Sequence, residues 1–484
     1  MKLNREILRL ALPSILANIT VPLVGMVDIA VVGHLGGAEG FSGAALIGGI
    51  SVGTMLFDLL YWNFGFLRAG TGGLTAQAYG RGDETGGILG RALRLALLSG
   101  LALIALQWVV VQGAFLVVEC SPEVRELATR YFYIRIWAAP ATLSLFALKG
   151  WFIGLQDTLR PMLVDLWVNL CNILLSLGLG FGLVIGADGL AGASGAGFTL
   201  LPRLGFAGVA WGTVIAQWTG LFLAFAVTRK YLSLSHLRLI LCAKSAENYQ
   251  EVANSEALSG HSTTSFFTLN RDLFLRSVGM IAVYIGFTVL SARLGDLMLA
   301  VSTILMKLLM IFSYFTDGFA YAGEALTGRF IGEHSLDGVR STVRGTFAWG
   351  FGLAGLFMLL YGPGGMPLFR LMTSDAGVVE AGRAFLPWLL LMPLIGCPAF
   401  TWDGIYIGAT ASKDLRNSTL LCAVGFFATW FIGLWLADIL NPGHGLQPET
   451  GLHVLMAAYF VHLAIRTLYQ TLRYRPAVLR AHFG

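Results

Sequence analysis

Charged residues and cysteines are both scarce in this chain of 484 residues. Asp, Glu, Lys and Arg make up 12% of the residues and hydrophobic residues 56%, whereas a soluble globular domain has about 25% charged residues. The five cysteines form no CxxC motif and no obvious pair, so neither a disulfide framework nor a metal site is supported. No extended polar domain is present, which excludes a soluble catalytic module.

Long apolar runs are the dominant pattern of the sequence. Each approaches or exceeds the about 20 residues that a membrane-spanning helix needs. Because backbone groups in hydrocarbon must be hydrogen-bonded within their own segment, we expect an all-α integral membrane protein of twelve spans. The first run lacks a cleavage site with a polar region after it and is interpreted as an uncleaved span. The runs lie at approximately 10–33, 43–67, 95–118, 131–155, 161–187, 204–228, 277–293, 297–324, 345–369, 384–410, 417–437 and 450–470.

Short motifs repeat between the first six runs and the last six. Residues 74–80 (LTAQAYG) return about 252 residues later as 326–332 (LTGRFIG), and 150–154 (GWFIG) returns as 404–408 (GIYIG). Six spans per half is an even number, so both halves enter the membrane in the same orientation. We therefore expect a pseudo-two-fold axis along the membrane normal with a cavity between the halves, which is a transporter architecture.

The domain boundaries follow from this repeat. We expect an N-terminal six-helix bundle at 1–230 and a C-terminal six-helix bundle at 271–484. The polar stretch 231–270 would connect them as a cytoplasmic linker, with one amphipathic helix near 231–241.

Basic residues are distributed unequally between alternate loops. Twenty-three of the 32 lie in the two terminal segments and in the loops on the same side, and six lie on the opposite side. This bias predicts that both termini are cytoplasmic. The net charge of +5 is therefore a topology signal and gives no support to nucleic-acid binding. Arg68, Arg135 and Lys307 remain inside spans.

Asp28 lies deep in the first span, in the segment 18–28 (NITVPLVGMVD). A charged side chain near the bilayer centre costs about 2.5–3.5 kcal/mol on insertion scales, so it requires a reason. Pro22 removes a backbone donor and can kink the helix. Helical spacing puts Asn18 and Pro22 on one broad face, with Asp28 about 80° away from it. Because desolvation favours the protonated carboxyl, we predict that Asp28 exchanges protons; the alternative is a carboxyl bonded to its neighbours or placed near the interface.

Four polar residues follow one face of the fifth span: Asp165, Asn169, Asn172 and Ser176. Such a face either binds a substrate or ties a neighbouring helix by interhelical hydrogen bonds. The sequence leaves both alternatives open. Asp165 lies near the cytoplasmic end of the span, where solvation also accounts for it.

The eighth span has the most heavily charged face, which includes Lys307, Asp317 and Glu324. This stripe predicts an internal ion-pair network or a water-filled cavity, with Asp317 as its main functional candidate. A lone Lys307 could instead extend its amine to the interface. Asp403 lies inside the tenth span and directly precedes the repeated motif at 404–408.

Several motifs, in order along nearly the whole chain, resemble the multidrug and toxic compound extrusion (MATE) family, specifically its DNA-damage-inducible F (DinF) branch. The segments that carry this resemblance are 18–28 with 32–35 (VGHL), 73–79 (GLTAQAY), 270–277 (NRDLFLRS), 317–325 (DGFAYAGEA), 403–410 (DGIYIGAT) and 415–418 (LRNS).

The resemblance implies two six-helix bundles forming a V, alternating access, and export of organic, often cationic and lipophilic compounds in exchange for protons or sodium ions. It implies a transporter without enzymatic activity, cofactor or metal centre other than the coupling ion. The expected partners are small drug-like molecules and membrane lipids, with no nucleic acid, and the expected functional unit is a monomer. The expected location is the bacterial inner (plasma) membrane.

The resemblance also assigns site residues. Asp28 matches an Asp of span 1 that helps to carry the coupling ion, and Asn172 matches an Asn of span 5 in the same site. Family members often have an Asp four residues later, where this chain has Ser176. The glutamate that other branches place in the middle of span 7 is also missing, although Asp317, Glu324 and Asp403 could build a different C-terminal site.

A single carboxylate favours proton transfer, because sodium prefers several oxygen ligands. The sequence therefore predicts a proton-coupled antiporter in which protonation of Asp28 from outside repacks span 1 near Pro22 and releases the drug. A sodium-coupled drug antiporter is the first alternative, and a lipid-linked oligosaccharide flippase is the second. A membrane prenyltransferase would need clustered carboxylates such as DDxxD, which are absent from the sequence. A channel is disfavoured by the long, inequivalent spans.

Overall fold

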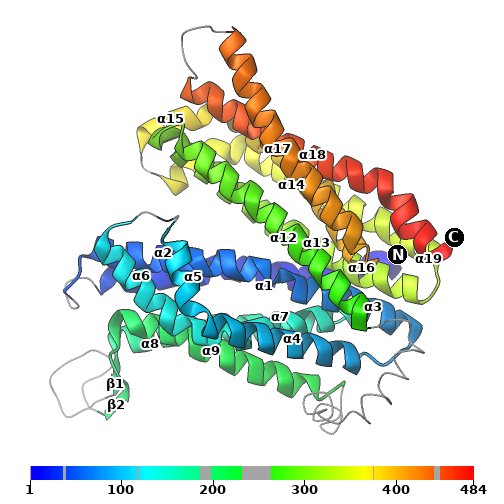
Figure 1. The fold of residues 1–484 in the computed structure, drawn as a ribbon, viewed down its shortest axis with the longest axis horizontal. Coiled ribbons are helices and arrows are strands. Elements are labelled where there is room, and N and C mark those ends of the chain that lie inside the picture. The colour runs from blue at the N-terminus through cyan, green and yellow to red at the C-terminus, as the bar shows by residue number, and fades with distance from the viewer. Residues whose placement is uncertain are drawn as a thin grey trace.

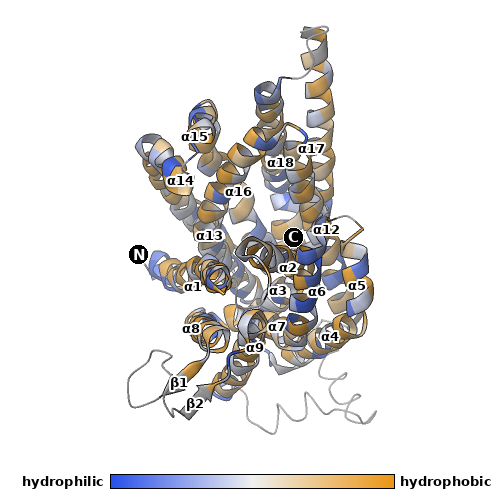
Figure 2. Ribbon diagram, turned by 90° about the vertical axis from the view of Figure 1, so that its left-hand side faces the viewer, coloured by the Kyte–Doolittle hydropathy of each residue, from blue (hydrophilic) through white to orange (hydrophobic). Residues whose placement is uncertain are grey.

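The computed structural model describes residues 2–35, 40–116, 118, 120–185, 198–231, 263–373, 375–440 and 447–484. Within these residues, 12 helical stretches are long and apolar enough to cross a membrane, as the apolar runs predicted. The long helices are predominantly hydrophobic, with hydrophilic positions interspersed among them (Figure 2). The fold is therefore the all-α membrane architecture expected from the sequence.

Several spans of the N-terminal half are interrupted. The second span breaks at Phe64, between α2 and α3, and the third breaks at Leu106, before the short α5. The helices of this half are α1 (Lys2–His34), α2 (Gly43–Asn63), α3 (Gly65–Arg81), α4 (Gly86–Ala105), α5 (Gln107–Ala114), α6 (Pro122–Arg135), the 3₁₀ turn η1 (Ile136–Ala138), α7 (Ala139–Gly154), α8 (Leu159–Phe181) and α9 (Gly205–Thr228).

The C-terminal half contains the longest helices. Both α13 and α14 have 37 residues, a length of about 55 Å that exceeds the about 30 Å hydrocarbon core of a bilayer. The helices of this half are α12 (Thr263–Ala292), α13 (Asp296–Gly332), α14 (Leu336–Met372), α15 (Ala376–Arg383), α16 (Leu386–Gly408), α17 (Ser412–Leu440), α18 (Pro448–Tyr474), the π-turn η2 (Arg475–Arg480) and α19 (Ala481–Phe483).

The two halves form a V. Helices α1 to α9 make one bundle and α12 to α19 the other, and the bundles meet near the two chain termini and diverge away from them (Figure 1). The V therefore opens on the side opposite the termini. Both termini lie at the same, closed end, as an even number of spans requires.

The repeated motifs meet each other at the closed end. A Cβ atom on Gly80 would overlap the carbonyl oxygen of Arg329, and one on Gly332 would overlap the carbonyl oxygen of Gln77. These are equivalent positions of the 252-residue repeat. The predicted pseudo-two-fold axis thus passes through this contact, where the missing side chains allow the backbones of α3 and α13 to touch.

A second pair of equivalent residues, Gln156 and Thr410, forms hydrogen bonds across the same contact. Gln77 Nε2 donates to the carbonyl oxygen of Gly408 at 3.0 Å and to Thr410 Oγ1 at 3.2 Å. Gln156 Nε2 donates to the carbonyl oxygen of Ala325 at 2.7 Å. Gln156 and Thr410 each follow a repeated glycine motif, and both have positive φ, at 64° and 53°. The closed end is therefore a specific interface with matched halves.

Two features differ from the sequence-based expectations or lie beyond them. A short antiparallel pair of strands, β1 (Leu183–Ile185) and β2 (Phe198–Leu201), connects α8 to α9 and was not predicted. Helix α12 begins at Thr263, inside the stretch expected to be the linker. The rest of that linker from residue 232, with the helix predicted near 231–241, lies outside the described residues.

Candidate functional site

Asp28 is buried between two helices of the N-terminal half. Its side chain on α1 is 8% exposed, and Ser176 Oγ on α8 donates a 2.8 Å hydrogen bond to Asp28 Oδ1. Asn172, one turn before Ser176, donates from Nδ2 to Thr213 Oγ1 on α9 at 2.8 Å. Its Oδ1 lies 3.4 Å from Ser176 Oγ. The three predicted residues Asp28, Asn172 and Ser176 therefore share one polar site.

The remaining predicted residues of this half lie nearer the closed end. Asn169 Nδ2 donates to Thr20 Oγ1 on α1 at 2.6 Å. Asn18 Nδ2 donates to the carbonyl oxygen of Tyr314 on α13 at 3.3 Å. Asn18 thus joins the two halves, whereas Asp28 faces α8, as their different helical faces predicted. The stripe on the fifth span consists largely of interhelical hydrogen bonds in this conformation.

Pro22 lies inside α1, which is a continuous helix from Lys2 to His34. A proline has no N–H to donate, so the carbonyl oxygen of Asn18 lacks its normal helical partner. A Cβ atom on Gly25 would meet nothing within 4 Å. The segment between Asn18 and Asp28 is therefore weakly held, which suits a helix that changes shape.

Arg135, at the end of α6, is the cation of this site. Its Nη1 donates to Tyr131 Oη at 3.1 Å, and its guanidinium lies 4.9 Å from the ring centroid of Phe57. Arg135 interacts electrostatically with Asp28 and with Asp58 of α2. Sequence analysis noted Arg135 inside a span but did not single out Asp58, although it lies within the apolar run 43–67.

Asp403 is held by cations of its own half. Arg276 on α12 and Arg466 on α18 both form ion pairs with its carboxylate, and Gln470 Nε2 donates to Oδ1 at 3.0 Å. The side chain of Arg466 is 2% exposed. Sequence analysis counted Arg276 with a loop and Arg466 with the C-terminal segment, outside the spans, which was wrong: Arg276 lies inside α12 and Arg466 inside α18. The position of Arg466 within the apolar run 450–470 was the signal that could have identified it.

The charged residues of α13 do not share one ion-pair network among the described residues; such a network was one of the two alternatives that the stripe predicted. Glu324 is fully buried and pairs with Arg68 of α3, with Nη1 2.9 Å from Oε2. Lys307 is exposed and forms no ion pair with any residue that the structure describes. Lys307 and Glu324 lie about 100° apart around the helix, and 17 residues separate them by about 25 Å along the axis. Asp317 is partly buried and interacts electrostatically with Arg68 and Asp403.

The three carboxylates of the C-terminal half therefore have different surroundings. Asp403 pairs with two arginines and Glu324 with a third, while Asp317 forms no hydrogen bond or ion pair within the described ranges. Among the described residues, no group of three or more His, Cys, Asp or Glu side chains could hold a metal ion.

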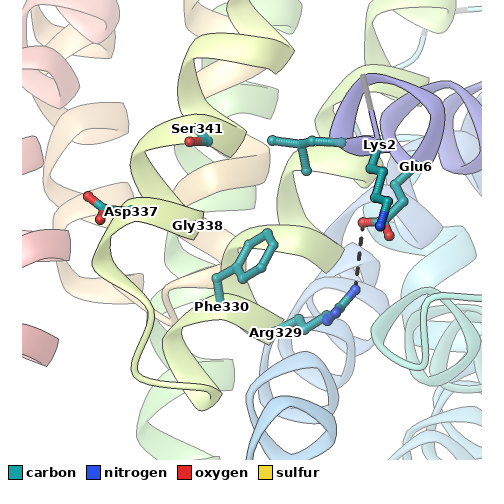
Figure 3. A pocket seen from close by; sticks show the side chains of 8 residues that line it. Lys2, Glu6, Arg329, Phe330, Asp337, Gly338 and Ser341 are labelled. Atoms are coloured by element: carbon teal, nitrogen blue, oxygen red, sulfur yellow. Dashed lines mark ion pairs between the residues drawn. The ribbon is translucent and has the colours of Figure 1, made fainter.

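A cavity of about 370 Å³ lies at the closed end, and none of the predicted site residues lines it (Figure 3). Lys2 and Glu6 of α1 line one side, and residues of α13 and of the start of α14 line the other. Arg329 Nη1 lies 3.7 Å from Glu6 Oε2 and bridges the two halves there. This cavity contains none of the buried carboxylates and lies at the interface between the halves.

Comparison with known proteins covers both halves of the chain. The MatE family model matches residues 13–177 and 273–430. The chain is 32% identical to DNA damage-inducible protein F of Escherichia coli (strain K12), with 96% of this chain and 90% of that protein aligned. It is 25% identical to probable multidrug resistance protein NorM of Deinococcus radiodurans, with 98% and 97% aligned.

Solved structures share the fold. MATE in the bent conformation matches with a TM-score of 0.77 at 15% identity, covering 100% of this chain and 98% of that one. The outward-facing conformation of a multidrug resistance MATE family transporter matches with a TM-score of 0.74 at 15% identity, covering 98% and 96%. One family model thus matches both halves of the V, and a relative aligns along almost the whole sequence. The chain belongs to the MatE family of multidrug and toxic compound efflux transporters, which are not enzymes.

Proposed function

We propose that this protein is a proton-coupled antiporter that exports organic, often cationic and lipophilic compounds across the bacterial inner membrane. The observation that carries the proposal is the buried Asp28 carboxylate, which the structure surrounds with neutral hydrogen-bonding groups and one arginine. A carboxyl in such a place can bind and release one proton, and its charge changes by one unit when it does so.

The surroundings of Asp28 support a proton over a sodium ion. Ser176 stands where relatives often place a second carboxylate, and its hydroxyl donates a hydrogen bond to Asp28. The amide nitrogen of Asn172 is engaged with Thr213. A hard cation prefers several oxygen ligands and compensating negative charge, whereas a proton needs only the carboxyl oxygen.

Asp403 in the C-terminal half is a poor ligand for a sodium ion. Asp403 forms ion pairs with both Arg276 and Arg466. A cation bound at Asp403 would either displace two guanidinium groups or be repelled by them. Breaking a buried ion pair costs about 3–5 kcal/mol. The arginines thus supply the positive charge that a sodium ion would bring.

Arg135 links the proton site to Asp58 of α2. With Asp28 ionised, the group of Asp28, Arg135 and Asp58 carries a net charge of −1 and attracts a cationic substrate. Protonation of Asp28 brings this net charge to zero, and Arg135 then neutralises Asp58 alone. Entry of a proton from outside therefore weakens the hold on the cation, which is the exchange that an antiporter requires.

Alternating access would use the two halves, 1–230 and 271–484, as the moving bodies. With both termini cytoplasmic, as the basic loops predict, the V described here opens to the outside. The weakly held segment of α1 around Pro22 is the element expected to change when Asp28 takes up its proton. The functional unit is proposed to be a single chain.

The test is substrate-triggered ion movement in proteoliposomes, measured under an imposed pH gradient and then under a sodium gradient. Wild type is compared with Asp28→Asn, which keeps the shape but cannot ionise, and with Asp337→Asn, a control whose side chain is 97% exposed. We expect export of a cationic dye to follow the pH gradient, to disappear in Asp28→Asn and to persist in the control.

Two other outcomes would refute proton coupling through Asp28. Export that follows the sodium gradient and survives Asp28→Asn would move the coupling site away from this carboxylate. Export that responds to neither gradient would favour the flippase alternative, which would then be tested with a lipid-linked oligosaccharide.

A further inference from the structure

Two equivalent turns carry hydrogen bonds that join the halves at the closed end. One follows α7 at residues 155–157, and the other follows α16 at 409–411. Each turn forms three backbone hydrogen bonds with the end of its helix, and these bonds correspond one to one at an offset of 254 residues. The middle residues, Gln156 and Thr410, have positive φ and bond to the opposite half. The two turns therefore have the same hydrogen-bond pattern and the same place in the interface.

These turns are held in an unfavourable backbone conformation. A left-handed φ is uncommon for any residue with a Cβ atom, so it persists only where surrounding contacts hold it. Neither Gln156 nor Thr410 is a glycine. The bonds across the interface supply one set of contacts, and the halves lose that set when they separate at this end. Contacts within each half therefore contribute to keeping the turn in the shape that the interface needs.

In the N-terminal half, Tyr231 supplies such a contact. It lies three residues beyond the end of α9 at Thr228. Its hydroxyl donates a 2.8 Å hydrogen bond to Asp157 Oδ2, and Arg160 bonds to both groups. The ring of Tyr231 also meets Trp151 of α7 edge to face, with centroids 5.7 Å apart. The chain that leaves the sixth span is thus fastened to the turn that follows the fourth.

In the C-terminal half, His482 of α19 holds the equivalent turn. Its Nε2 donates to the carbonyl oxygen of Ala409 at 3.0 Å. Val478, one turn earlier, is fully buried and anchors this segment. Helix α19 lies beside α16 at the closed end, next to the mark of the C-terminus (Figure 1). The same offset of 254 residues leads from Thr228 to His482, so the holding residues of both halves follow the last span in a matching position.

We propose that the segments following the last span of each half are paired clamps, in which Tyr231 holds the 155–157 turn, His482 holds the 409–411 turn, and both stabilise the closed end. Release of either residue lets its turn relax from the left-handed conformation and weakens the hydrogen bonds to the opposite half. The two segments, both predicted to be cytoplasmic, thereby bias the conformation of the protein from outside the membrane. This inference rests on the alternating access of the proposed function and names a regulatory element for it.

The test compares variants that remove one hydrogen-bond donor at a time. Tyr231→Phe keeps the ring and removes the hydroxyl, and His482→Ala removes the imidazole. His482→Gln is the rescue variant, because its amide can still donate to the carbonyl oxygen of Ala409. Lys230→Gln and Arg480→Gln are the controls, because both side chains are exposed and lie in the same two segments as the clamp residues.

The readout is the distance distribution between two spin labels at the open end, measured in lipid nanodiscs after the native cysteines are replaced. Leu116→Cys and Leu371→Cys provide the label sites, because both positions are highly exposed and lie on opposite halves. Opening of the closed end brings the two labels together, so the ratio of short to long distances reports the conformational equilibrium.

Each clamp variant is expected to raise this ratio about two- to tenfold, the effect of one lost hydrogen bond. The double variant Tyr231→Phe with His482→Ala should raise it by the product of the single effects, because the clamps act on separate turns. His482→Gln and both controls should stay close to wild type. Unchanged ratios in the clamp variants would overturn the proposal, and so would an effect of His482→Gln as large as that of His482→Ala.

Export of a cationic dye under a pH gradient is measured on the same variants in proteoliposomes. Export that persists while the clamp variants leave the distance ratio unchanged would refute the clamps and leave the proposed function intact. Absence of pH-driven export in wild type would refute the proposed function, and the distance ratios would still decide whether the clamps hold the closed end.

Discussion

Breaking the ion pair between Arg68 and Glu324 is expected to favour the conformation in which the closed end opens. The pair joins α3 of one half to α13 of the other at 2.9 Å, with Glu324 fully buried and the Arg68 side chain 16% exposed. When the halves separate at this end, both groups gain access to water. Removal of one partner therefore penalises the present conformation selectively, because only here is the remaining charge buried.

Because Glu324 is more deeply buried than Arg68, replacing Arg68 is expected to shift the conformational populations more than replacing Glu324. Arg68→Met leaves the fully buried Glu324 unpaired, and the cost of breaking a buried pair is about 3–5 kcal/mol. The Arg68 position is 16% exposed, so water that enters there beside Glu324 reduces this cost to about 2–3 kcal/mol, or about 30- to 150-fold in population. Glu324→Gln leaves Arg68 with some water and with the ring of Tyr321 at 4.5 Å. That variant should cost about 1–2 kcal/mol.

The populations can be measured by distance distributions between spin labels at the open end. Leu116 and Leu371 are 87% and 82% exposed and lie on opposite halves, so Leu116→Cys and Leu371→Cys serve as label sites after the five native cysteines are replaced. We expect the fraction of molecules with the shorter distance between the labels to increase in the order wild type, Glu324→Gln, Arg68→Met. A state favoured 99:1 becomes about evenly populated after a 100-fold shift.

Two controls decide whether the ion pair is responsible. Arg340→Gln breaks an exposed pair with Asp337 on one helix and should leave the distribution unchanged. The double variant Arg68→Met with Glu324→Gln should shift it less than Arg68→Met alone, because no charge remains buried. An unchanged distribution in Arg68→Met, or additive effects in the double variant, would refute the reasoning.

Other predictions concern the matched halves and the arginine cluster. Gly80→Ala and Gly332→Ala should each destabilise the closed end to a similar extent, by about 1–3 kcal/mol, because each added Cβ would overlap a facing carbonyl oxygen. The same distance measurement is made on the control Gly87→Ala, whose added Cβ would meet nothing within 4 Å. Unequal effects of Gly80→Ala and Gly332→Ala would contradict the symmetry of the two halves. Asp403→Asn should lower the thermal unfolding midpoint, because it leaves the buried Arg466 without its counter-ion at a cost of about 3 kcal/mol or more. An unchanged unfolding midpoint would contradict a stabilising role of the Asp403–Arg466 ion pair.

The membrane fold could be read from the sequence because hydrocarbon allows few solutions. Runs of apolar residues predict helices, and all twelve spans are present. The repeated glycines at 80 and 332 predicted the symmetry. Only the structure showed that the equivalent glycines contact the opposite half, since a repeat in sequence does not say which copies touch.

The candidate site was partly predictable. Asp28, Asn172 and Ser176 lie together because helical periodicity fixes which residues share a face, and the structure adds the pairing of α1 with α8. Lys307 and Glu324 show the limit of the same rule: they lie about 100° apart around the helix and too far apart along its axis to interact. Distance along a helix and the choice of neighbouring helix both matter.

What the sequence alone determined is the number of spans, their division into two halves and the presence of charges that a bilayer does not tolerate without a partner. These depend on composition and spacing, which are local properties. The tertiary structure decided which charges meet: Glu324 with Arg68 across the interface, and Asp403 with two arginines of its own half. Such pairings join residues that are far apart in the chain, and only the packing of the helices brings them within the short range of a hydrogen bond or an ion pair.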